Sequence, residues 1–217
     1  MTDYASRRTM MVDTQVRPSD VTSFPIIDAM LSVPRELFVP ANLREAAYIG
    51  ENLNLGGGRV MLEPRTLGKM LTALDIAPTH VALDLGCGLG YSTAILAHLC
   101  EFVVGIEDDE ARAEEAQSLL SNQGIDNAAV MAGALTEGAE KSGPYDIIII
   151  EGGVEEVPAS LTAQLKEGGR IACIFAEGAL GVVRVGHKLD DNINWRFAFN
   201  ASAAVLPGFE RKSAFAL

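Results

Sequence analysis

The sequence has little positive charge and no long apolar run. Its 217 residues include 17 Lys and Arg against 29 Asp and Glu, which gives a net charge of −12, and no basic cluster offsets this. Such a chain repels nucleic acid, so we exclude a nucleic-acid partner. No apolar run reaches the roughly 18 residues of a membrane span. Residues 1–8 are polar and lack the core of a signal peptide, so we expect no membrane association.

Cysteine and histidine are also scarce. The three cysteines, Cys87, Cys100 and Cys173, lie in apolar contexts without Cys-x-x-Cys spacing, and the three histidines are scattered. Neither set has the spacing of metal ligands, so we predict no metal site. We interpret the cysteines as buried, reduced thiols of a cytoplasmic protein, in preference to a disulfide or metal role. Oligomeric state cannot be inferred from the sequence.

One stretch of the sequence organises the rest. The apolar run Val81–Leu85 contains Asp84 and leads into a loop with glycine at every second position, followed by a helical pattern over residues 91–99. Strand, glycine-rich turn and helix form the first half of a nucleotide-binding βαβ unit. Glycines without a Cβ let the backbone approach a ligand closely. The stretch predicted to contact a ligand comprises Asp84, Leu85, Gly86, Cys87, Gly88 and Gly90.

A second buried-strand pattern, residues 102–107, ends in the acid pair Glu107 and Asp108. An acid about 20 residues beyond the loop can accept hydrogen bonds from ribose hydroxyls. This spacing fits both NAD and S-adenosylmethionine and does not choose between them. A tight turn in any α/β protein would also account for the glycines alone.

The remaining pattern predicts an α/β fold. Residues 4–74 read as helices separated by prolines, with a loop over residues 48–59 that contains Gly56, Gly57 and Gly58. From residue 80 strands and helices alternate, and the run Ile147–Ile150 is typical of a central parallel strand. Short strand-like pieces at 182–185, 195–199 and 213–217 would extend the sheet in antiparallel fashion. Trp195 is interpreted as a core residue.

Four stretches resemble a known family, the protein-L-isoaspartate O-methyltransferases, which belong to the class I S-adenosylmethionine-dependent methyltransferases. They cover most of the chain from about residue 9 to 176, and the first and fourth are more specific than the glycine loop. The stretches are Ala29-Met30 with Val33–Pro40, the loop Leu83–Tyr91, Gly143–Ile148, and Val157-Pro158 with Leu161, Gln164-Leu165 and Gly168-Gly169.

The resemblance implies a doubly wound, mostly parallel Rossmann-like sheet of seven strands, one of them antiparallel, with helices on both faces and an N-terminal helical extension. It implies a single domain, with residues 1–76 on the acceptor side and 77–217 as the cofactor-binding core. It also implies methyl transfer from S-adenosylmethionine to the α-carboxylate of isoaspartyl residues in damaged proteins. An acid two residues before the first glycine, here Asp84, is characteristic of the methyltransferase loop and favours this cofactor over a dinucleotide. Motif matching places Asp84, Gly86 and Gly88 at the methionine part and Glu107 at the ribose.

Two positions depart from the family pattern. The family carries a Thr-Ile-Ser-Gln-Pro type motif before the glycine loop, with its serine at the acceptor site; this chain has Leu62 at the serine's place and Glu63 at the glutamine's. The family also has Gly-Asp-Gly after its fourth strand, where the acid faces the adenine amino group. Here Gly133 is followed by Ala134, and Glu137 is a candidate substitute.

Methyl transfer from a sulfonium to an ionised carboxylate needs alignment more than acid–base help, so the absence of a Ser/His/Asp arrangement is no argument against an enzyme. An anionic acceptor needs a cation, and Arg59 and Arg65 flank the altered motif. They are equally well read as solvated surface arginines. Glu151, at the end of a strand, is read either as a residue at the cofactor's edge or as plain strand termination.

Two functions therefore remain open. The first is isoaspartyl carboxyl methylation. The second is a divergent member that binds S-adenosylmethionine but methylates another acceptor or has a non-catalytic role, which Leu62 and Ala134 favour. A dehydrogenase is a distant third.

Overall fold

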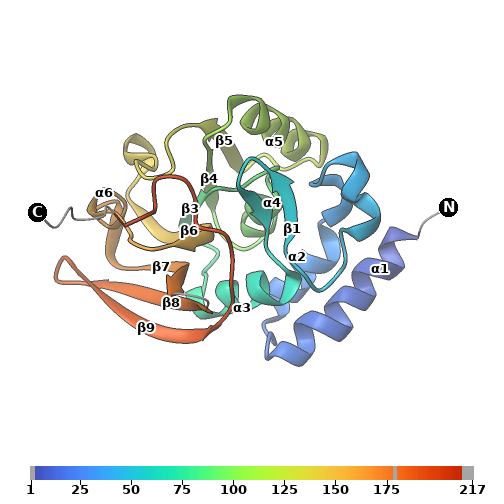
Figure 1. Cartoon of the computed structure of the whole chain (residues 1–217), viewed down its shortest axis with the longest axis horizontal. Helices are drawn as coiled ribbons and strands as arrows, with labels where there is room; N and C mark the ends of the chain where they lie inside the picture. The colour runs from blue at the N-terminus through green and yellow to red at the C-terminus, as the bar shows by residue number, and fades with distance from the viewer. Residues whose placement is uncertain (1–2, 178–179, 212–217) are drawn as a thin grey trace, which may run out of the picture.

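The structure, a computed structural model of the chain, describes residues 3–177 and 180–211. Within them, seven strands form one sheet in the order β5-β4-β3-β6-β7-β8-β9, and a separate hairpin pairs β1 with β2. Figure 1 shows β3, β4 and β6 in the middle of the molecule and β8 and β9 at its lower left edge. The strands are β1 (Leu53–Gly56), β2 (Arg59–Met61), β3 (Val81–Leu85), β4 (Phe102–Glu107), β5 (Ala128–Ala132), β6 (Tyr145–Val154), β7 (Leu165–Glu177), β8 (Leu180–Leu189) and β9 (Asn192–Asn200).

The helices lie before the sheet in sequence and between its parallel strands. The first, α1, continues into a π-helical turn at Val12–Val16 and a 3₁₀ turn at Arg17–Ser19, which contains Pro18. The α-helices are α1 (Tyr4–Met11), α2 (Phe24–Ser32), α3 (Pro64–Leu74), α4 (Tyr91–Ala97), α5 (Glu110–Asn122) and α6 (Ala159–Thr162). Further 3₁₀ turns are Arg35–Leu37, Ala41–Ala46 and Glu140–Ser142. No helix of the described ranges is both long and apolar enough to cross a membrane.

Strand direction confirms the predicted sheet. β3, β4, β5, β6 and β7 pair in parallel, whereas β8 pairs antiparallel with both β7 and β9. Among the described strands of the large sheet, β8 thus runs opposite to the rest, as expected of a sheet with one reversed strand. The segments 182–185 and 195–199 lie in β8 and β9. The segment 213–217, also expected to be strand-like, lies outside the described residues.

The central strands bury both faces, as parallel sheets do. Alternate residues such as Ala82, Ile147 and Ile149 face a cluster built with helices α1–α5. Their neighbours, including Leu83 and Ile148, face a second cluster, which the C-terminal segment closes with Leu206 and Phe209. Leu161 of α6 belongs to this second cluster. The sheet is therefore covered on both faces, as predicted.

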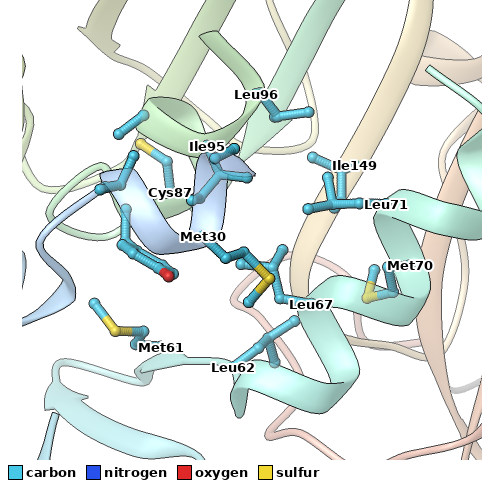
Figure 2. Packing of buried hydrophobic residues seen from close by; sticks show 14 of the residues in the cluster. Met30, Met61, Leu62, Leu67, Met70, Leu71, Cys87, Ile95, Leu96 and Ile149 are labelled. Atoms are coloured by element: carbon cyan, nitrogen blue, oxygen red, sulfur yellow. The ribbon is translucent and has the colours of Figure 1, made fainter. Parts of the chain in front are cut away.

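The N-terminal extension is part of this core. Figure 2 shows Met30, Met61, Leu62, Leu67, Met70 and Leu71 converging on Cys87, Ile95, Leu96 and Ile149 of the sheet and its helices. The loop expected over residues 48–59 was partly wrong, because the chain there forms the hairpin β1–β2. Gly56, Gly57 and Gly58 all have positive φ and turn the chain back within three residues.

Gly153, near the end of β6, provides a test of how the C-terminal segment is held. Its N–H donates to Ala204 O at 2.8 Å, and its carbonyl accepts from Leu206 N at 2.9 Å. A Cβ on Gly153 would lie 2.6 Å from Ala203 O, which belongs to the backbone and cannot turn away. We expect Gly153→Ala to lower the free energy of unfolding by about 1–3 kcal/mol in urea titrations.

The matched control is Gly133→Ala, whose new Cβ would meet nothing closer than Ile106 Cγ2 at 3.6 Å. This change should alter the free energy of unfolding by no more than about 1 kcal/mol. Equal stabilities for the two variants would show that the segment 203–206 is not held in this way.

Candidate active site

The glycine loop has the geometry that the sequence predicts. β3 ends at Leu85 and α4 begins at Tyr91, and the intervening Gly86, Gly88 and Gly90 have φ of 74°, 59° and 92°. Residues with a side chain rarely adopt these values, so the loop depends on glycine at each of the three positions. The Gly86 N–H donates to Ile106 O of β4 at 2.9 Å, which fixes the loop against the neighbouring strand.

Asp84 lies beneath this loop and is fully buried. Its Oδ2 accepts from Ser92 Oγ and Thr93 Oγ1, both at 2.7 Å, from the first turn of α4. Its Oδ1 has no hydrogen-bond partner within residues 3–177 and 180–211. Burial raises the pKa of Asp84 from 3.8 to about 6, against the two hydroxyl hydrogen bonds, which lower it.

Glu151 brings a second buried carboxyl group to the same place. It is 4% exposed, and its Oε1 also lacks a partner among the described residues. Burial raises the pKa of Glu151 well above its usual range; the charge of Asp84 adds to the rise and that of Arg35 opposes it. Glu151 lines a cavity of about 10 Å³ together with Leu62, Gly86, Cys87, Tyr91 and Ser92. Of its two sequence interpretations, the structure therefore favours a place at the glycine loop over plain strand termination.

Glu107, the predicted ribose acceptor, is fully buried and fully engaged. Its carboxylate accepts from Gly88 N at 2.9 Å, Arg112 Nη1 at 3.0 Å and Arg59 Nε at 2.9 and 3.2 Å. The adjoining Asp108 pairs with Arg59 Nη2 at 2.5 Å. Burial raises the pKa of Glu107, while the charges of Arg59 and Arg112 oppose that rise.

The two arginines expected near an acceptor carboxylate have different environments. Arg59 is fully buried and held by Glu107 and Asp108, so it is not a solvated surface residue and faces the predicted ribose acceptor. The Arg65 side chain is 43% exposed and lies 3.4 Å from Glu63 Oε1. The same Glu63 oxygen accepts from Thr66 Oγ1 at 2.7 Å. The structure does not bring Arg59 and Arg65 together around one acceptor.

Leu62 is held by a residue whose role the sequence did not reveal. Its side chain is 1% exposed and points into the apolar cluster (Figure 2). Its carbonyl accepts from Nη2 of the fully buried Arg35 at 2.7 Å, and Arg35 Nε donates to Ala47 O at 2.6 Å. The Arg35 guanidinium also lies 4.7 Å from the centre of the Tyr91 ring. Arg35 therefore fastens the altered motif to the N-terminal extension and to α4.

Gly133 and Ala134 follow β5 beside the strand that carries Glu107. Gly133 N donates to Glu107 O at 2.9 Å, and Ala134 O accepts from Glu137 N at 3.0 Å. Ala134 and Glu137 are exposed. Glu137 lines a surface hollow with Thr136 and Ser160 rather than the cavity at Glu151. No group of three or more His, Cys, Asp or Glu suited to a metal ion occurs in the part of the chain that the structure describes.

The carboxyl groups of Asp84 and Glu151 would suit a ligand with a cationic end, but the cavity at the glycine loop is too small for it. The unpaired oxygens of Asp84 and Glu151 would suit an ammonium or sulfonium group. Pockets for ligands of drug size enclose about 300–1,000 Å³, whereas the cavity that Glu151 lines at the glycine loop has room for about one water molecule. At the other end, arginines already occupy Glu107. In this conformation the site does not fit a nucleoside cofactor.

The sheet order, the glycine loop after β3 and the acid at the end of β4 define a Rossmann-like methyltransferase fold. A solved protein-L-isoaspartate O-methyltransferase matches the chain with a TM-score of 0.81 at 23% identity, covering 93% of this chain and 66% of the other. A putative protein-L-isoaspartate O-methyltransferase from Plasmodium falciparum was solved with S-adenosyl-L-homocysteine. It matches with a TM-score of 0.79 at 20% identity, and the match covers 95% of this chain and 99% of the other. At these identities the likeness shows the fold.

Sequence comparison defines the family. The model of the protein-L-isoaspartate(D-aspartate) O-methyltransferases matches residues 6–196. The enzyme of that name from Roseiflexus castenholzii is 36% identical over 169 residues, 78% of this chain and 77% of the relative. The enzyme from Syntrophus aciditrophicus is 36% identical over 171 residues, which are 79% of this chain and 78% of the relative. The chain belongs to the protein-L-isoaspartate O-methyltransferase family, whose methyl donor is S-adenosylmethionine.

Asp84 makes the stability of the fold depend on pH. Because its pKa is raised from 3.8 to about 6 on folding, its stabilising contribution is complete below about pH 4 and is lost as pH rises through 6. A shift of about two units corresponds to about 3 kcal/mol. We expect the free energy of unfolding of the natural protein, minus that of Asp84→Asn, to fall by about 2–3 kcal/mol between pH 4 and pH 7. Urea unfolding at each pH measures this, and a difference that is constant with pH would contradict it.

Proposed function

We propose that the chain transfers a methyl group from S-adenosylmethionine to the carboxylate of isoaspartyl residues in damaged proteins. Its family membership supports this reaction, and so do the enzymes of that name that cover more than three quarters of the chain. The structural observation that carries the proposal is the buried pair Asp84 and Glu151 at the glycine loop. Each keeps one carboxyl oxygen without a partner among the described residues.

We assign the cofactor's methionine end to Asp84, Leu85, Gly86 and Cys87, and its ribose end to Gly88, Glu107 and Asp108. Gly90 supports the loop, and Gly133 and Ala134 border the adenine side. Two features support the assignment. The unpaired Asp84 Oδ1 suits a cationic group, and Gly133 N binds the Glu107 carbonyl at 2.9 Å. A ligand of this size requires the space beside Glu107 to open.

We propose that residues 1–76 form the acceptor side and residues 77–217 the cofactor-binding core of one domain. The Arg35 contacts with the carbonyls of Ala47 and Leu62 support this division, because they join separate parts of the acceptor side into one unit. Arg65, exposed at the first turn of α3, is the more available cation for an acceptor carboxylate. Arg59 is held by two acids in this conformation. The three buried, unpaired cysteines support a reducing, cytoplasmic setting.

A second function stays open because of one residue. Leu62 stands where the family has its acceptor-site serine, and it offers no hydrogen-bonding group. A divergent member that binds S-adenosylmethionine but acts on another acceptor, or on none, would keep the glycine loop and lose the serine.

Two measurements test the proposal together. Calorimetric titration should show binding of S-adenosyl-L-homocysteine and no binding of NAD, because Asp84 and the loop match the methyltransferase pattern. Transfer of labelled methyl groups from S-adenosylmethionine to an isoaspartyl peptide, compared with the matching aspartyl peptide, tests the acceptor. Binding of NAD in place of S-adenosyl-L-homocysteine would overturn the proposed cofactor. Cofactor binding without methylation of the isoaspartyl peptide would favour the divergent function.

The altered motif predicts weak isoaspartyl activity in the natural sequence. An acceptor carboxylate beside Leu62 lacks a donor that serine would supply, at a cost of about 1–3 kcal/mol. If this cost falls on the transition state, the rate drops roughly tenfold to a hundredfold. We expect Leu62→Ser with Glu63→Gln to raise the rate on an isoaspartyl peptide by about that factor.

Glu63→Gln alone is the matched control, because a Gln carbonyl can keep the hydrogen bond from Thr66 Oγ1 while position 62 stays apolar. Its rate should rise much less than that of the double variant. Activity of the natural protein equal to that of an ordinary family member in the same assay would rule out a deficit at Leu62.

A further inference from the structure

The hairpin β1–β2 covers the ribose end of the candidate site. It is a two-stranded unit outside the large sheet, with Leu53 paired to Met61 and Asn54 to Val60. Such a hairpin is marginally stable by itself and depends on contacts with the rest of the molecule. The contacts of its base and of its tip differ in kind, and this difference indicates which part can move.

The base of the hairpin is firmly held. Asn52 Nδ2 donates to Ser202 O at 2.7 Å, and Asn52 Oδ1 accepts from Glu63 N at 2.8 Å. Leu53 and Met61 are buried in the main cluster, and Arg35 holds the carbonyl of Leu62. These contacts involve uncharged hydrogen-bond acceptors and apolar side chains that no cofactor would replace.

The tip is held mainly by ions. Arg59 reaches Glu107 at 2.9 Å and Asp108 at 2.5 Å. Arg112 Nη1 lies 3.0 Å from Glu107 Oε1, while its Nη2 donates to Gly56 O at 3.4 Å. The glycines 56–58 add no side chain to the contact. The tip is therefore attached through groups that a ligand at Glu107 would have to displace.

The number of hydrogen bonds that Glu107 can accept shows that Arg59 and a ribose would compete for it. A carboxylate has about four lone-pair sites. Three N–H donors already bind it, Gly88 N, Arg112 Nη1 and Arg59 Nε, and the last is shared between the two oxygens. Two ribose hydroxyls need two acceptor sites, so one of these donors must leave. Gly88 N belongs to the loop itself and Arg112 to α5, whereas Arg59 lies on the separate hairpin.

The apolar part of the hairpin closes the same space. A Cβ on Gly88 would lie 2.9 Å from Leu55 Cδ1, so the Leu55 side chain occupies the approach to the loop that glycine leaves open. Leu55 and Val60 also line the cavity of about 10 Å³ at Glu151. Arg59 and Leu55 together fill the place that the cofactor needs.

We propose that Arg59 is an internal latch, a cation on the hairpin tip that occupies the ribose acceptors Glu107 and Asp108 and competes with the cofactor. The proposal rests on the proposed use of S-adenosylmethionine. The closed hairpin is the resting form, and binding requires the tip to leave while the base stays anchored by Asn52. Arg59 then passes from the buried Glu107 and the more exposed Asp108 to water. The latch lowers the apparent affinity by the fraction of molecules that are open.

The test is calorimetric titration of S-adenosyl-L-homocysteine into the full-length natural protein and into Arg59→Met. Met keeps much of the apolar stem but removes the charge, and Arg112 and Gly88 N still neutralise and bind Glu107. We expect the affinity of Arg59→Met to be about tenfold or more higher, which corresponds to an open fraction of about one tenth or less in the natural protein. The control Arg17→Met removes an exposed arginine that pairs with Asp13 and should not change the affinity.

Hydrogen exchange on the natural protein supplies a measurement that does not depend on the variant folding. Saturating S-adenosyl-L-homocysteine should speed amide exchange in residues 54–60 while it slows exchange in the loop 84–91. Unchanged or weaker binding by Arg59→Met, or slower exchange in the hairpin with ligand, would overturn the latch and leave the proposed cofactor standing. Absence of binding by both proteins would reject the cofactor, and the latch with it.

Discussion

The ion cluster at Glu107 is the interaction on which the site depends. It joins β4, the glycine loop, the start of α5 and the hairpin β1–β2 through a single carboxylate. Two charges this deeply buried are costly unless their geometry is good and the other polar atoms are satisfied. Three N–H donors satisfy Glu107, whereas Nη1 of the buried Arg59 has no hydrogen-bond partner among the described residues. The cluster therefore holds the loop in shape through Glu107, while Arg59 is its less satisfied member.

The acids at the opposite end of the site have no such partners. Asp84 and Glu151 are buried close to the same loop. The charge of Arg35 opposes the rise in the Glu151 pKa, but its guanidinium donates to backbone carbonyls. The site is thus electrostatically uneven, with a hydrogen-bonded carboxylate at Glu107 and one unpaired carboxyl oxygen on each of Asp84 and Glu151. A cationic ligand would gain most beside Asp84 and Glu151. At Glu107 it would have to displace an arginine that is already bound.

Most of the fold could be predicted because its signals are local. The apolar runs of β3, β4 and β6, the glycines after β3 and Pro64 at the start of α3 each specify their own element. The hairpin was missed because its strands of four and three residues are too short for periodicity to reveal them. The glycine loop and Glu107 were predicted by spacing, but the Arg59 contact joins residues 48 apart in sequence and leaves no pattern. Arg35 was visible only as one letter of a motif, since its partners are carbonyls, which every residue has.

The hydrogen bond from Asn52 to Ser202 spans 150 residues, and the segment 203–206 lies against Gly152 and Gly153 of β6. The base of the hairpin and the cover of the sheet's far face therefore depend on the last part of the described chain. During synthesis, the glycine loop and both strands beside it leave the ribosome long before Ser202 does. Because contacts of such high sequence separation form late and slowly, a nascent chain has a formed nucleotide loop before it has an anchored hairpin above it.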